Sequence, residues 1–177
     1  MNKFIFLTLV SGFLLIQAST AASTGSAEIT TDTFGSSVDL TVSGSIADWS
    51  LTVGENEDTT SIDMTVLSNN ADGYEVTVYD ALDSGKGADS AGHMTDYTGA
   101  AYIDSHLTNA LQIKSSGTDA YVSLSGDEQT IESKASASED GGDSYDIGIK
   151  QALAPSDRIP SAGHTYRIIV TFVITAL

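Results

Sequence analysis

The central part of the chain alternates between apolar and polar residues with a period of two. Apolar residues recur at every second position after Val38, Ile62, Tyr74 and Tyr145, and mostly polar residues fill the positions between them. Successive side chains of a β-strand point to opposite faces, so each segment has one buried and one solvated face. This pattern predicts antiparallel sheets that are packed on one side.

The alternation divides the chain into short strands separated by turn residues. The strong runs predict strands over residues 38–42, 49–53, 62–66, 74–79 and 145–150, and weaker runs predict strands over residues 28–33, 111–114, 121–124, 130–133 and 165–175. Residues rich in Asn, Asp and Gly predict turns at 54–58, 69–73 and 125–128, because these residues tolerate left-handed backbone. Residues 83–101 and 133–144 are expected to be irregular. One short helical turn is expected near residues 104–111. The predicted fold is all-β, an antiparallel β-sandwich of about nine or ten short strands, with a β-barrel as the alternative.

The last strand is apolar on both faces. Ile168, Val170, Phe172 and Ile174 share one face, and the other face carries Ile169 and Val173. A strand that is buried on both sides within its own sheet, or one that a partner covers, has this composition.

The N-terminal segment, residues 1–22, has the pattern of a secretory signal peptide. Lys3 precedes an apolar run over residues 4–16, and small residues follow at 19–22. The run of 13 residues is short for a membrane span, which needs about 20. We therefore expect cleavage and export, with a retained anchor as the alternative, and a single mature domain over residues 23–177. No later segment is long and apolar enough to span a membrane.

Charge narrows the range of partners. The 177 residues include 7 Lys and Arg against 24 Asp and Glu, a net charge of −17; without residues 1–22, six basic residues remain and the charge is −18. Such a surface argues against nucleic-acid binding and against docking on anionic membranes. Copies of the chain repel one another, so an assembly must offset this repulsion by burial or bound cations.

Residues that could carry chemistry form no recognisable motif. His93, His106 and His164 lack ligand spacing, and neither G-x-S-x-G nor H-E-x-x-H occurs. The acidic clusters near residues 55–58, 80–83, 127–128 and 139–143 do not follow a calcium-loop pattern and are expected to be solvated, although loops at one end of a sandwich could pool them for calcium. Trp49 and Tyr74 fit core positions. We therefore expect no catalysis and no cofactor, and calcium is the one ion kept open.

The segment D-W-S-L-T-V at residues 48–53 resembles the first W-x-L element of WxL-type surface proteins of bacterial cell walls. The second element of that family is altered here, because Tyr166 is followed by Phe172, Val173 and Ile174 without a tryptophan. Together with S-N-N-A-D-G-Y-E-V-T-V, Y-D-I-G-I-K-Q and Y-R-I-I-V-T-F, the chain over residues 40–175 is similar to secreted β-sandwich surface proteins of archaea and bacteria. This resemblance implies an exported, non-catalytic domain associated with the cell envelope.

Two functions follow as hypotheses. The first is an extracellular structural protein that self-associates into a cell-surface filament, sheath or layer by exchanging a terminal strand. Its candidate contact residues are Ile29 and Phe34 in the N-terminal arm, and Ile168, Val170, Phe172 and Ile174 in the last strand. The arm is the freer of the two segments. The second hypothesis is a module that binds wall polymer or carbohydrate.

Overall fold

The computed structural model describes residues 35–82 and 85–177, and the predicted signal peptide and the strand at residues 28–33 lie outside these residues. Antiparallel strands dominate the described part. They are β1 (Val38–Gly44), β2 (Gly54–Asp58), β3 (Ile62–Ser68), β4 (Tyr74–Asp80), β5 (Thr95–Tyr97), β6 (Tyr102–His106), β7 (Gln112–Ser115), β8 (Val122–Ser123), β9 (Gln129–Lys134), β10 (Asp143–Leu153), β11 (Thr165–Arg167) and β12 (Val170–Ala176). One 3-10 turn, η1 (Ala88–Ser90), follows β4.

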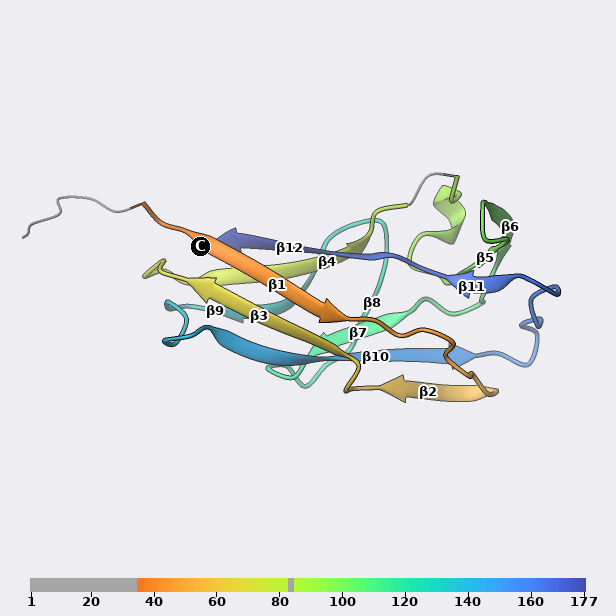
Figure 1. Cartoon of the computed structure of the whole chain (residues 1–177), viewed down its shortest axis with the longest axis horizontal. Helices are drawn as coiled ribbons and strands as arrows, with labels where there is room; N and C mark the ends of the chain where they lie inside the picture. Colours follow the sequence, from red (N-terminus) through yellow and green to blue (C-terminus); the bar gives the residue numbers. More distant parts are fainter. Residues whose placement is uncertain (1–34, 83–84) are drawn as a thin grey trace, which may run out of the picture. The chain divides into compact units, whose positions relative to one another are not determined.

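The strands form a β-sandwich, as the period-two pattern predicts (Figure 1). The larger sheet has the order β1-β3-β10-β7-β8, and β2 pairs with the second half of β10. The facing sheet has the order β12-β4-β9, and a small sheet, β11-β5-β6, continues from it because β11 leads into β12. Neither main sheet closes on itself, so both have edge strands.

The core lies between the two main sheets. The inward residues of β3, β4 and β10 are almost fully buried, as their alternation requires: Met64, Val66, Tyr74, Val76, Val78, Ile147 and Ile149. Ile113 of β7, Ile131 of β9, Leu111 and Leu124 belong to the same cluster, and Trp49 packs against it half-buried. The core position expected for Tyr74 is confirmed, and Trp49 lies at the margin of the core.

The structure differs from the prediction at residues 49–58, where the expected strand is irregular and the expected turn is a strand. Residues 49–53 are irregular, whereas Gly54–Asp58, expected to be a turn, is β2. The Asn56 side chain explains the shift, because its Oδ1 accepts from Thr52 N at 2.8 Å and its Nδ2 donates to Thr52 O at 2.8 Å. These bonds fold residues 52–56 locally, and the edge of β10 then pairs with the residues that follow.

The predicted helical turn at residues 104–111 is wrong. Residues 102–106 form β6, which pairs with β5 in the stretch expected to be irregular. Leu107 and Leu111 are both buried, but their N–H groups donate to Met94 O at 2.9 Å and Gly92 O at 2.8 Å. Their spacing therefore reflects two contacts with the segment before β6, and not one face of a helix.

The connection from β10 to β11 is the most exposed apolar point of the described chain. Ile159 is 93% exposed, and its neighbour Arg158 is exposed as well. Within the described residues, no helix has the length and apolar character that crossing a membrane requires.

Candidate assembly edge

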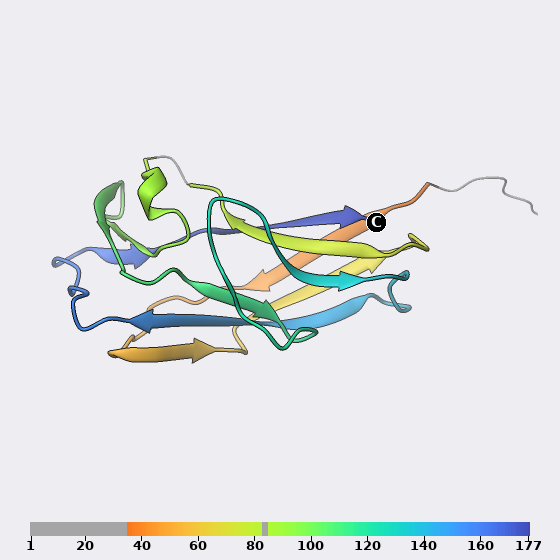
Figure 2. The ribbon, with the colours of Figure 1, turned by 180° about the vertical axis from the view of Figure 1, so that it is seen from behind.

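Strand β12 lies at the edge of its sheet. It contains Val170, Phe172 and Ile174, three of the four contact residues predicted in the last strand, and Ile168 lies two residues before it. It pairs with β4 over seven residues, from Val170 opposite Asp80 to Ala176 opposite Tyr74. Among the described strands it pairs with β4 alone, and β1 of the other sheet runs beside it (Figures 1 and 2). The segment that was expected to be either central or covered by a partner is thus an edge strand of its own sandwich.

The side chains of β12 that face the core are only half covered. Ile168, Val170, Phe172 and Ile174 all pack against the core cluster, yet each is half-buried. Their neighbours on β4 differ: Val78, opposite Phe172, and Val76, opposite Ile174, are 0% exposed. The core-facing side chains are therefore fully covered on β4 and only partly covered on the next strand, β12.

The facing sheet is open on the same side. β1 is its edge strand and contacts β12 across the sandwich. Val42 of β1 points inward, opposite the fully buried Met64, and is nevertheless 37% exposed. We call this side of the sandwich, bounded by β1 and β12, the open side.

The opposite side of the sandwich is closed. There β9 lies against β7 and β8, and Ile131 and Leu124 are each 2% exposed. The buried Glu132 carboxylate also accepts a hydrogen bond from Ser115 Oγ across the two sheets. The incomplete cover is therefore a property of one side, and not of a small sandwich in general.

The edge of β12 also lacks the usual protection against strand addition. Edge strands commonly carry charged residues or proline, which discourage pairing with another chain. Residues 168–177 contain neither. β1, by comparison, carries Asp39.

Both boundaries of the open side are tied to one turn. In the turn between β3 and β4, Asn69 Oδ1 accepts from Ser37 N at 2.7 Å, just before β1 begins. Leu177 N donates to Gly73 O at 3.1 Å, just after β12 ends. The start of β1 and the C-terminus therefore lie at the same end of the sandwich (Figure 1). Ile29 and Phe34, the site residues predicted in the arm, lie outside the described residues.

A polar network holds the two sheets together near this end. Tyr74 Oη donates to Asp143 Oδ2 at 2.6 Å and lies 2.6 Å from Tyr145 Oη, while Lys134 Nζ contacts the same carboxylate at 3.0 Å. Burial alone would raise the pKa of the Asp143 carboxyl, but the hydrogen bonds from Tyr74 and Lys134 outweigh it, so the net pKa is lowered. Burial and the neighbouring carboxylate raise the pKa of Tyr74 far above its usual value.

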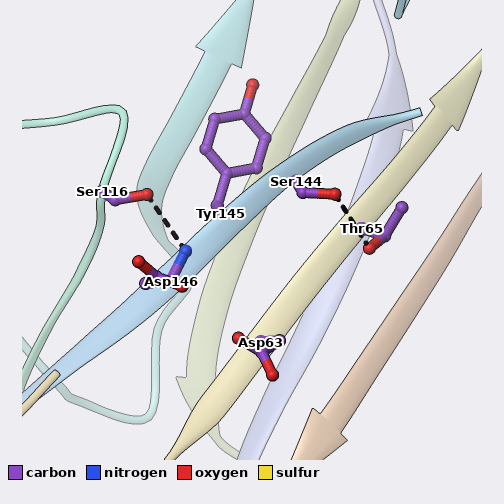
Figure 3. Close-up of a pocket in the computed structure, with 6 residues that line it drawn as sticks. All are labelled: Asp63, Thr65, Ser116, Ser144, Tyr145 and Asp146. Carbon is purple, nitrogen blue, oxygen red and sulfur yellow. Dashed lines mark hydrogen bonds between the residues drawn. The ribbon is translucent and has the colours of Figure 1, made fainter. Parts of the chain in front are cut away.

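A pocket of about 290 Å³ lies on the outer face of the larger sheet (Figure 3). It is lined by Asp63, Thr65, Ser116, Ser144, Tyr145 and Asp146. Asp63 and Asp146 are directly opposite each other on β3 and β10, so two like charges face one another there. The hydroxyl group of Tyr145 is hydrogen-bonded to that of Tyr74, and the other lining residues are polar. Pockets for small organic ligands are mostly apolar, which this lining is not.

The histidines are more engaged than their sequence context suggests. His93 is half-buried with Nδ1 2.8 Å from Leu107 O, and its ring meets that of His106 at 5.0 Å. His164 Nδ1 lies 2.9 Å from Asp96 Oδ1. In the part of the chain that the structure describes, no three His, Cys, Asp or Glu residues come together in a way that could hold a metal ion.

One buried ion pair was not anticipated from the sequence. Lys86 and Asp80 bond to each other with side chains that are 0% and 1% exposed. Asp80 follows the apolar run of β4 directly, and this position at the end of a buried strand was the only signal for it.

No protein-family model, curated protein or solved structure matches this chain. The assignment of a function therefore rests on the residues and the geometry described above.

Proposed function

We propose that this protein is a non-catalytic extracellular structural protein, a subunit that self-associates into a filament, sheath or layer at the cell surface. One observation carries the proposal: the outer edge of β12 is free of charge and proline, on a side of the sandwich where core residues are half-buried. An edge of this kind promotes pairing with another chain. Burial there would offset the repulsion between subunits of charge −18 after signal removal.

The test is the assembly state of the mature chain, residues 23–177. Size-exclusion chromatography with light scattering, with and without millimolar calcium, should give species much heavier than one subunit, and negative-stain microscopy should show ordered filaments or sheets. A monomer under every condition would overturn the proposal. The comparison with calcium also reports whether a cation is needed to screen the acidic surface.

Export is part of the same proposal. Residues 1–22 would be removed by a signal peptidase, and the protein would lie outside the cell. The mass and the N-terminal sequence of protein recovered from the culture medium or cell surface test this step. A chain recovered from membranes with Met1 intact would instead support a retained anchor.

The alternative function is a module that binds wall polymer or carbohydrate. It rests on the W-S-L resemblance, and the described aromatic side chains give it little support. Tyr74 and Tyr102 are buried, and the ammonium groups of Lys114 and Lys150 lie over the Tyr121 ring. Retention of the mature protein on isolated envelopes in the presence of calcium, without self-association, would favour this alternative.

A further inference from the structure

We propose that the outer edge of β12 accepts the N-terminal arm, residues 23–35, of a second copy of this chain as an added β-strand. This inference rests on the proposed function, because it specifies the acceptor and the donor of the assembly. The occupant is a segment of the same chain, which precedes β1 and lies almost wholly outside the described residues.

Two features of β12, its edge backbone groups and its half-buried side chains, suit it to accept an added strand. At every second residue, an edge strand points N–H and C=O groups away from its neighbour, and no other described strand pairs with these groups along the seven residues of β12. Its inward side chains Val170, Phe172 and Ile174 are half-buried beside a fully buried β4. A further strand would pair with these backbone groups and cover these side chains.

The arm is long enough for this role. Its thirteen residues span about 43 Å when extended at about 3.3 Å per residue. Covering the seven residues of β12 takes about 23 Å, which leaves about 20 Å to pass from one copy to the next. In an extended arm, Ala27, Ile29, Thr31 and Thr33 share one face, whereas Phe34 lies on the other face with the acidic Glu28 and Asp32. Ile29 is therefore the side chain suited to reach the core.

The exit point of the arm favours another copy over the arm's own β12. Ser37 is held by Asn69, and the end of β12 is held by the same turn. To cover its own β12, the arm would have to reverse and cross between the sheets immediately before Ser37. An arm that continues away from β1 needs no such reversal.

The resulting contact joins two different surfaces, the arm of one copy and β12 of the next. Head-to-tail contacts of this type build open chains unless the rotation between copies happens to close a ring. The inference thus favours a filament over a closed oligomer.

The test uses three variants of the mature chain. An acceptor variant, Thr171→Lys with Thr175→Lys, places charge on the β12 edge, and Thr175 lies opposite Glu75, which gives one new lysine a partner. A matched variant, Thr41→Lys with Ser43→Lys, makes the same charge change on β1, where Ser43 lies opposite Asp63. A donor variant, Ile29→Asp, places a charge on the face of the arm that would cover the core, and it alters no residue of the strands from β1 to β12.

We expect the acceptor and donor variants to be folded by circular dichroism and monomeric by light scattering. The β1 variant should assemble like the wild type. Mixing the acceptor and donor variants should yield a dimer of twice the subunit mass that does not grow further. This dimer would retain one intact arm on one intact β12. It would also show that both variants are folded.

Two other outcomes separate the inference from the function. If the wild type assembles and the acceptor variant assembles equally well, or if the mixture forms no dimer, the inference is overturned while the proposed function stands. If the wild type is monomeric under every condition, the proposed function itself fails. Assembly lost only in the β1 variant would move the acceptor to the other edge and would overturn the inference as well.

Discussion

Replacing Lys86 by methionine should destabilise the domain strongly, because it leaves a buried carboxylate without its cation. Lys86 Nζ bonds to Asp80 and donates to His93 O at 2.8 Å, and Asp80 Oδ2 also accepts from Gly92 N at 2.9 Å. Burial lowers the pKa of Lys86, and the hydrogen bond and charge of Asp80 oppose that shift. Methionine keeps much of the volume of the lysine stem, so the change removes mainly the charge and its hydrogen bonds.

Removing one partner of a buried ion pair costs about 3–5 kcal/mol. This is a large share of the stability of a domain, which is typically about 5–15 kcal/mol. With a denaturant dependence of about 1.5–3 kcal/mol per molar urea, the unfolding midpoint should fall by about 1–3 M.

The fluorescence of Trp49, the single tryptophan, is a suitable probe for urea unfolding because this residue packs against the core. The double variant Lys86→Met with Asp80→Asn should recover part of the loss, since no buried charge is left unpaired. Lys114→Met is the matched control: Lys114 is half-buried, contacts the Tyr121 ring, and should cost at most about 1 kcal/mol. A loss below about 1 kcal/mol for Lys86→Met, or strict additivity in the double variant, would refute the argument.

Three further predictions concern the backbone and the carboxylates. Gly92→Ala should lower the free energy of unfolding by at least about 1–3 kcal/mol, because Gly92 has φ +79 and an added Cβ would lie 2.0 Å from a backbone oxygen. The control Gly87→Ala meets open space and should leave the melting temperature unchanged in the same thermal melts. Asp63→Asn should raise stability by about 0.2–1 kcal/mol at low salt by relieving the repulsion from Asp146, and high salt should erase the gain; an unchanged gain in high salt would point to another cause. The folded pKa of Asp143 is lowered, so its contribution is present above the unfolded pKa of about 3.9 and is lost as pH falls through the lower folded value. The stability difference between wild type and Asp143→Asn should therefore shrink from pH 5 towards pH 2, and a difference that is constant with pH would contradict the role of its hydrogen bonds.

The regular strands were predictable because their alternation and their burial are the same physical fact. Val76 and Val78, for example, are polar-flanked apolar residues in the sequence and 0% exposed residues in the structure. β2 could not be predicted in this way. Its residues Gly54–Asp58 are polar throughout, and they are a strand because Asn56 folds the segment before them and β10 offers an edge.

The apolar residues of the candidate site could be predicted from the sequence, but the position of their strand at the edge of the sheet could not. The apolar character of residues 165–175 is visible in the sequence, but a strand of this composition suits the centre of a sheet as well as a covered edge. Sheet order decides between the two, and it depends on pairings between segments far apart in the chain, such as β12 with β4. The Lys86–Asp80 pair was missed for a similar reason, since burial of Lys86 depends on how the loop after β4 folds back.

The exposed connection before β11 has a consequence for proteolysis. Among the described basic residues, Arg158 alone is exposed, whereas Lys86 is buried and the others are half-buried. Trypsin acting on the folded protein should therefore cut first between Arg158 and Ile159, and the cut leaves β12 held by noncovalent contacts alone, namely its pairing with β4 and its packing against the core. Such a nick would turn the last strand into a separate peptide that a denaturant could release and a labelled synthetic copy could replace.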